Sequence, residues 1–96
     1  MPVVLASVPG SITREQYEES IRRLHPSGRL ESPADLPVEG LLAHITGETP
    51  DGFRVIDVWE SEDAVRRFAE ILGPILQELG VVAQPVVYEA HTFVTA

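Results

Sequence analysis

The chain has 96 residues, enough for one hydrophobic core, so we expect residues 1–96 to form a single domain. Its formal net charge is −8, from 15 acidic residues against 7 basic ones, and all 7 basic residues are arginine. An acidic surface repels nucleic acids and anionic membranes, so neither is expected as a partner.

The missing residue types restrict the chemistry further. Without cysteine the chain forms no disulfide, thiol nucleophile, zinc–thiolate site or iron–sulfur cluster. Without lysine it forms no Schiff base through its own side chains. Residues 1–5 lack the basic segment of a secretory signal, and no apolar run of about 18 residues occurs. We therefore expect a soluble, unexported protein located in the cytoplasm.

The first part of the chain predicts a strand, a helix and a long loop. Residues 3–8 are apolar and valine-rich and end at a Pro-Gly pair, which is typical of a buried strand. Thr13 and Gln16 have the spacing of a helix capping box, and Pro26 ends that helix near position 24 or 25. Residues 26–39 predict an ordered loop, either a lid or partner surface or a plain surface crossover. The buried stripe of the helix consists of Tyr17, Ile21 and Leu24.

The second part of the chain predicts a hairpin, a helix and a last strand. Residues 40–48 and 53–60 are rich in strand-forming residues, and the Thr-Pro-Asp-Gly sequence between them predicts a β-hairpin. Ser61 is the predicted N-cap of the second helix, and the Gly-Pro pair at 73–74 predicts a kink or a break into two helical pieces. Gly80 is suited to end that helix, and residues 86–94 then form the last strand.

The element order β-α-β-β-α-β predicts a ferredoxin-like α+β fold, with a four-stranded antiparallel sheet and two helices on one face. Right-handed crossovers further predict that the first and third strands lie side by side at the centre as a parallel pair. Large apolar groups occur at both alternate sets of positions in the third and last strands. The sheet face without helices is therefore apolar, and self-association through it is the simplest way to cover it.

Two segments carry a resemblance to known proteins. They are Gly-Leu-Leu-Ala-His at 40–44 and Gly-Phe-Arg-Val-Ile-Asp-Val-Trp-Glu-Ser at 52–61, followed by Phe68 and by the Gly-Pro pair at 73–74. With the element order, they resemble the dimeric α+β barrel superfamily, near the antibiotic-biosynthesis monooxygenases. The resemblance implies a homodimer with two sheets back to back and a small-molecule pocket in each subunit. Its members include cofactor-free oxygenases, haem-degrading enzymes, lactone isomerases and cyclases, so it implies no single reaction.

The hairpin register decides whether His44 and Asp57 form a catalytic pair. If the loop is the four residues 49–52, then His44 faces Asp57, with Cβ atoms roughly 5 Å apart, and Leu42 faces Trp59. A carboxylate at that distance holds an imidazole in one tautomer and makes it a stronger base, which suits a general base near neutral pH. A three-residue loop with Gly52 as a bulge shifts the register by one residue and turns Asp57 to the opposite face. The other interpretation is that His44 has no catalytic role and is only satisfied by a backbone or carboxylate hydrogen-bond partner in a half-buried strand.

The remaining candidates are aromatic side chains and two further histidines. The aromatic ones, which packing alone explains equally well, are predicted to bind substrate and comprise Trp59, Tyr17, Phe68 and Tyr88. His91 is placed at the opposite sheet edge from His44, and His25 caps a helix. The histidines have no metal-ligand spacing and no phosphate-binding glycine motif occurs, so we expect no metal and no cofactor.

Three functions fit these residues. The first is a cofactor-independent enzyme of monooxygenase, isomerase or cyclase type that acts on a hydrophobic aromatic or polyketide-like molecule, with His44 as base and Asp57 orienting it. The second is a non-catalytic ligand-binding or accessory dimer. The third is a haem-handling protein with His44 or His91 as axial ligand and Arg54 or Arg22 near a propionate.

Overall fold

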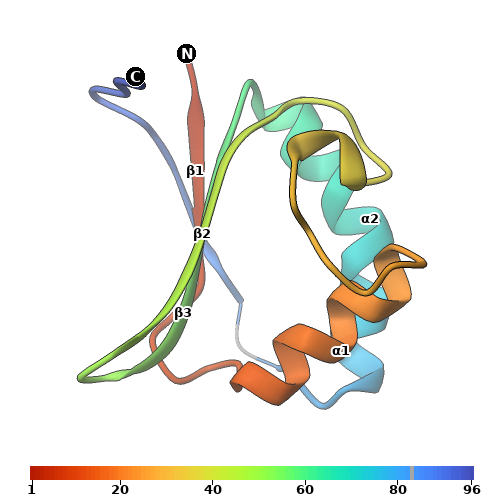
Figure 1. Ribbon diagram of the computed structural model, residues 1–96. Helices are drawn as coiled ribbons and strands as arrows, with labels where there is room; N and C mark the ends of the chain where they lie inside the picture. The colour runs from red at the N-terminus through yellow and green to blue at the C-terminus, as the bar shows by residue number, and fades with distance from the viewer. Residues whose placement is uncertain (83) are drawn as a thin grey trace.

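The computed structural model describes residues 1–82 and 84–96, and a four-stranded sheet with two helices makes up its fold. Both helices cover the same face of the sheet (Figure 1). The β-α-β-β-α-β order is confirmed. The elements are β1 (Val3–Ala6), α1 (Arg14–Leu24), the 3₁₀ turn η1 (Pro33–Asp35), β2 (Leu41–Thr49), β3 (Gly52–Trp59), α2 (Glu62–Glu78) and β4 (Val86–Glu89).

The strands lie in the order β2-β3-β1-β4, and every neighbouring pair is antiparallel. This is the ferredoxin-like arrangement. The prediction that β1 and β3 run in parallel is wrong. The hairpin reverses the chain between β2 and β3, so β3 runs opposite to both of its neighbours. Two pairs of strands share a direction. α1 connects β1 with β2, which β3 separates, and α2 connects β3 with β4, which β1 separates.

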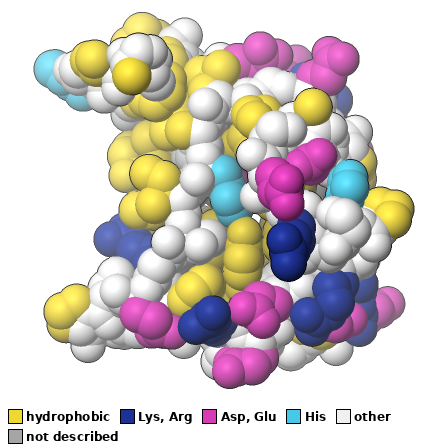
Figure 2. All heavy atoms as spheres, in the orientation of Figure 1, with side chains coloured by type: hydrophobic (Ala, Val, Ile, Leu, Met, Phe, Trp, Pro, Cys, Tyr) yellow, Lys and Arg dark blue, Asp and Glu magenta, His cyan; other side chains and the backbone are white. Residues whose placement is uncertain are grey.

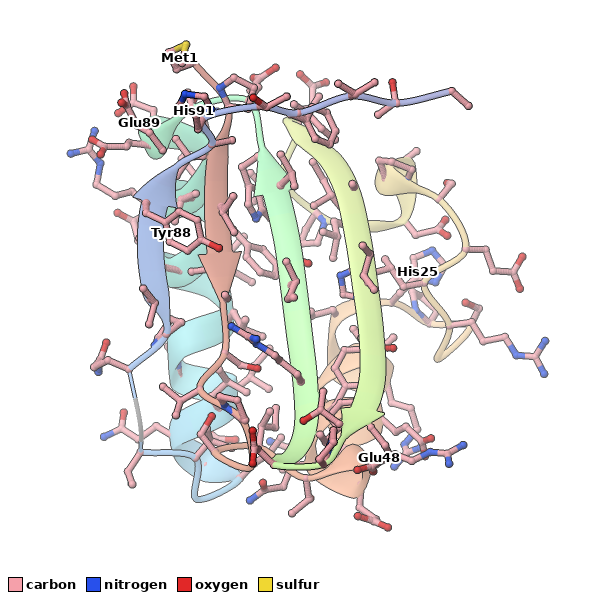
Figure 3. The ribbon with its side chains drawn as sticks, turned by 90° about the vertical axis from the view of Figure 1, so that its left-hand side faces the viewer. Met1, His25, Glu48, Tyr88, Glu89 and His91 are labelled. Atoms are coloured by element: carbon pink, nitrogen blue, oxygen red, sulfur yellow. The ribbon has the colours of Figure 1, made fainter. Side chains whose placement is uncertain are left out.

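The first and last strands are both shorter than predicted, because each ends early. β1 ends at Ala6 rather than at position 8, although Ser7 still exchanges hydrogen bonds with Val55 through its N–H and its hydroxyl oxygen. β4 ends at Glu89 rather than at position 94. The N–H of Ala90 still donates to the carbonyl of Pro2, and the tail that follows crosses the sheet face opposite the helices (Figure 3).

The helices begin where their capping residues predict. Thr13 and Gln16 form the complete capping box of α1, and the Ser61 hydroxyl accepts the N–H of Ala64 at the start of α2. α2 ends in two hydrogen bonds, from the N–H of Gly80 to Gln77 and from the N–H of Val81 to Leu76. These are the two bonds of a Schellman motif, which needs a left-handed residue at Gly80, where φ is +84°.

α2 is one continuous helix through the Gly-Pro pair, so the predicted alternative of two helical pieces is wrong. Pro74 has no N–H, so the carbonyl four residues before it lacks its helical donor. Gly73 and Pro74 are both exposed, so water can bond that carbonyl instead. Phe68 before the pair and Leu76 after it both line the space beneath the sheet. This packing on either side holds the two halves of the helix in line.

The loop of residues 26–39 is ordered, as predicted, and contributes to the core. It contains η1, and the Asp35 carboxylate accepts the N–H groups of Glu31 and Ser32, which closes the turn. Leu36 and Val38 beyond the turn are buried with Trp59 in the main core, between the sheet and the helices. The loop therefore covers one end of the helical side of the sheet.

The opposite face of the sheet is apolar and largely uncovered. Ile45 of β2 is 62 % exposed, and Val86 and Tyr88 of β4 are each 50 % exposed. A small cluster of Val4, Ala6 and Ala90 lies on this face beneath the side chain of Phe93. Hydrophobic side chains gather along this side of the molecule (Figure 2), and Tyr88 lies on it (Figure 3). In the described part of the chain, neither helix has the length and apolar character needed to cross a membrane.

Candidate functional site

The hairpin places His44 directly opposite Asp57. The ladder pairs Thr49 with Gly52, so only two residues form the loop, and the predicted pairing of His44 with Asp57 is confirmed. The alternative register with a bulge at Gly52 is wrong. The bulge lies instead at the far end of β2, where Leu41 pairs with Trp59 and Leu42 is the extra residue. The predicted pairing of Leu42 with Trp59 is therefore wrong.

A tyrosine from α1 completes a hydrogen-bonded chain with this pair. The Nδ1 atom of His44 lies 2.5 Å from Oδ1 of Asp57, and its Nε2 atom lies 2.6 Å from the hydroxyl of Tyr17. An ionised carboxylate only accepts, so Nδ1 carries the imidazole proton and Nε2 accepts the tyrosine O–H. The Tyr17 ring also lies against Phe53, with centroids 5.5 Å apart. The result is a Tyr17–His44–Asp57 triad in which each member has a partner.

Burial makes this triad costly to break. Asp57 is 4 % exposed, and a carboxylate so buried is stable only when it is paired and hydrogen-bonded. Burial, the charge of Asp57 and the charge of Glu18 together raise the pKa of Tyr17 to about 12. Tyr17 therefore stays a neutral phenol at neutral pH and donates its proton to His44.

The triad lies in the wall of a cavity of about 100 Å³, together with the polar side chains of Ser7, Ser11 and Ser20. The wall is otherwise mainly aliphatic and comes from α1, α2, the sheet and the loop of residues 26–39. That loop contributes Leu30 and Leu36, so a lid over the cavity remains one of its two interpretations. The other apolar lining residues include Leu5, Ile12, Ile21, Leu24, Val55, Phe68, Leu72 and Leu76.

The structure brings only some of the predicted aromatic residues to this cavity. Tyr17 and Phe68 line it. Trp59 is fully buried in the main core, where its ring packs against Phe68 with centroids 4.9 Å apart, and it is not in the cavity wall. Tyr88 lies on the opposite face of the sheet, because it pairs with Val4, whose side chain points away from the helices.

The other two histidines lie away from the triad. His25 caps the C-terminus of α1, as predicted, and its Nδ1 contacts the hydroxyl of Ser27. His91 follows β4 in the exposed tail and contacts Thr92. Within residues 1–82 and 84–96, no three histidine, aspartate or glutamate side chains gather closely enough to hold a metal ion.

The hydrogen bond from Tyr17 to His44 was not predicted, although both residues were candidates. A signal for it exists, since Tyr17 belongs to the buried stripe of α1 and His44 shares its face of the sheet with Asp57, toward the helices. The wall also includes Leu30, Leu36, Val81 and Pro85, which come from loops without a periodic pattern.

Comparison with known proteins adds no assignment to this geometry. No protein-family model matches the chain, and no curated protein matches it. The function therefore has to be argued from the triad and the cavity.

Proposed function

We propose that the chain binds a hydrophobic, aromatic or polyketide-like small molecule and acts on it as a cofactor-independent enzyme, with His44 as general base. The observation that carries the proposal is the pairing of His44 with the buried Asp57 in the wall of a mainly apolar cavity. Aspartate is disfavoured in strands and costly to bury, so its place in mid-strand needs a purpose beyond packing. Such a pair, in the wall of a mainly apolar cavity, is an arrangement that suits general-base catalysis.

The proposed chemistry is removal of a proton beside a carbonyl group of the substrate. Asp57 holds the Nδ1 proton of His44, which leaves Nε2 as the basic nitrogen. Tyr17 occupies Nε2 in the unliganded chain, so its hydroxyl has to turn toward the ligand before the base acts. There it donates to the carbonyl oxygen, on which negative charge develops as the proton leaves. This step serves a monooxygenase, an isomerase or a cyclase equally.

The second candidate is a non-catalytic ligand-binding or accessory protein. It is favoured by the completeness of the triad, because every polar hydrogen of Tyr17 and His44 already has an acceptor within the protein. A network with all its hydrogen bonds formed within the protein needs no catalytic role, because positioning α1 on the sheet is enough to explain it.

A haem-handling function does not fit this cavity. Cofactor pockets usually measure about 300–1,000 Å³, and this cavity measures about 100 Å³. Both ring nitrogens of His44 already form hydrogen bonds within the protein. Arg54 lies on the opposite face of the sheet, since it is two residues from Ile56 along β3 and therefore points to the same side.

We further propose that the chain is a dimeric α+β barrel, a homodimer formed through the uncovered sheet face. The exposure of Ile45, Val86 and Tyr88 on that face supports this. The open face also carries Arg54, whose Nε is buried without a partner in the described chain. A dimer of this kind is also what the resemblance of the sequence to the antibiotic-biosynthesis monooxygenase-like proteins implies. Cytoplasmic localisation stays a prediction.

A proton-exchange experiment tests the catalytic proposal. The protein is incubated in heavy water with a single-ring aryl ketone such as acetophenone, and NMR follows exchange of the protons beside the carbonyl. Wild type should exchange them at least about 100-fold faster than His44→Ala, since a positioned base contributes that much or more. His91→Ala is the matched control and should behave as wild type.

Ligand binding separates the two candidate functions. A thermal-shift panel holds aromatic polyketides, quinones, lactones and haem, and it is run on wild type, His44→Ala and Asp57→Asn. Binding that survives in both variants, together with no exchange in wild type, would favour the binding protein over the enzyme. Absence of both proton exchange and ligand binding would contradict the enzyme and the binding protein alike.

A further inference from the structure

We infer that the cavity selects a compact, uncharged, ring-sized molecule and rejects carboxylates and phosphates. We also infer that, while Tyr17 stays bonded to His44, a hydroxyl group on such a molecule donates to the Tyr17 oxygen. The inference rests on the proposed function only in that the cavity is taken as the ligand site. It goes beyond that function by stating the charge, the size and the anchoring group of the ligand. Three observations carry it.

The first observation is the charge of the cavity wall. Its titratable members are Tyr17, His44 and Asp57, and the described lining contains no arginine. Arg14 lines a separate shallow cleft that Tyr17 also borders, where its guanidinium is paired with Glu18 at 3.1 Å. An anionic ligand would lose its hydration in the cavity and meet the buried carboxylate of Asp57 with no free cation to compensate. The wall therefore disfavours anions.

The second observation is the size of the cavity. An apolar cavity of about 150 Å³ is known to hold one benzene molecule, and this cavity of about 100 Å³ is somewhat smaller. Modest movement of flexible lining side chains such as Leu30 and Leu72 is enough to admit one ring. A fused-ring molecule would require the loop of residues 26–39 to move as well, since Leu30 and Leu36 of that loop line the cavity.

The third observation is the supply of hydrogen-bonding atoms. The hydroxyls of Ser11 and Ser20 donate to the backbone carbonyls of Val8 and Tyr17, and so have no proton left for a ligand. The hydroxyl oxygen of Ser7 accepts the N–H of Val55, and its own proton has no acceptor among the described residues, so Ser7 is free to donate to a ligand. The Tyr17 oxygen gives its proton to His44 and keeps lone pairs, so it is an acceptor at the polar end of the cavity. Burial keeps this group a neutral phenol, whose pKa is about 12.

Three ring-sized probes test the inference: phenol, toluene and benzoate at neutral pH. Dissociation constants are measured on the intact chain by NMR titration of methyl signals. Phenol should bind about fivefold to tenfold more tightly than toluene, the usual effect of one hydrogen bond. Benzoate should show no saturable binding. Tyr17→Phe should remove the advantage of phenol over toluene, whereas the matched variant Tyr88→Phe should keep it.

Each contrary outcome overturns a stated part. Benzoate binding as tightly as phenol would overturn the selection against anions, and equal binding of phenol and toluene to wild type would overturn the role of Tyr17. Neither comparison requires a variant, so both hold even if Tyr17→Phe fails to fold. Failure of all three probes to bind would show that the cavity is not a ligand site, which overturns the proposed function together with this inference.

Discussion

Asp57 shows how much of the site depends on a single pairing. The carboxylate lies in mid-strand, 4 % exposed, and its only side-chain hydrogen bond in the described chain goes to His44. A pair of this kind adds little net stability when complete, but removal of one partner leaves a buried charge that nothing compensates. Stability and function are therefore tied together at this position.

Removal of the imidazole should destabilise the fold more than neutralising the carboxylate. His44→Ala leaves Asp57 buried without a partner, and we expect a loss of about 1–3 kcal/mol in the free energy of unfolding. Asp57→Asn keeps an oxygen that accepts from Nδ1 and should cost less. Urea denaturation measures both, with the exposed His91→Ala as a control that stays within about 0.5 kcal/mol of wild type. Equal stability of His44→Ala and wild type would contradict the buried pair.

Tyr17 should be recognisable by its titration. The chain has 2 tyrosines, so Tyr88→Phe leaves Tyr17 as the only one. Burial and the charges of Asp57 and Glu18 raise the pKa of Tyr17 from 10.0 to about 12, and ultraviolet absorbance of the phenolate should show this value. A midpoint near 10 would mean that the tyrosine is solvated and separated from the triad.

The same shift has a consequence for stability at high pH. The folded protein holds the Tyr17 proton up to a pKa of about 12, whereas the unfolded chain releases it near 10.0. The stabilisation is therefore fully present below pH 10 and decreases as the pH rises from 10 to 12. Tyr17→Phe should lose less stability than wild type over this range.

At the scale of elements, the β2–β3 hairpin is held against the turn that follows β1. Gly52 starts β3 with φ of +123°, and a Cβ atom there would lie 2.7 Å from the Cα of Gly10. The N–H of Gly10 also donates to the carbonyl of Phe53. The close approach of these two turns positions the hairpin, and with it the strand that carries Asp57.

A side chain at Gly52 should therefore disturb the hairpin. Gly52→Ala combines a left-handed backbone with a backbone clash, and we expect it to cost more than about 1 kcal/mol. Gly47→Ala on β2 is the matched control, because its Cβ would have no neighbour within 4 Å and its φ is not positive. Thermal unfolding of the two variants measures the difference. Similar melting temperatures would show that the two turns move apart freely.

At the scale of the whole molecule, the uncovered sheet face predicts a dimer. Ile45 of the edge strand β2 is 62 % exposed on that face, so Ile45→Glu would place a charge in the interface. We expect wild type to sediment with the mass of two chains and Ile45→Glu with the mass of one. Val82→Glu is the control, since Val82 is 88 % exposed outside the strands and should leave the dimer intact. A wild-type monomer would contradict the dimer.

The local elements were predictable because their signals are local. The capping residues Thr13 and Ser61 mark both helix starts, and the Pro-Asp loop sets the hairpin register as far as His44. The pairing of His44 with Asp57 follows from that register, since side chains directly opposite one another share a face. The turn does not fix the register at the far end of β2, so the sequence did not predict the bulge at Leu42.

The relation between distant segments depended on the tertiary structure. The direction of β3 beside β1 follows from the hairpin reversal, and the crossover argument alone predicted it wrongly. The placement of Trp59 behind Phe68 rather than in the cavity wall reflects competition among large apolar side chains for one core. Such competition is decided by shape and volume in three dimensions, which periodicity does not describe.

By itself, the sequence determined the element order, the helix ends and the pairing of His44 with Asp57, because capping and strand register act over a few neighbouring residues. Only the tertiary structure brought Tyr17 from α1 to Nε2 of His44 and placed Leu30 and Leu36 of the loop in the cavity wall. These contacts join segments far apart in the chain, and packing of the helices on the sheet sets their distances. The triad is therefore a product of the packed fold rather than of any one motif.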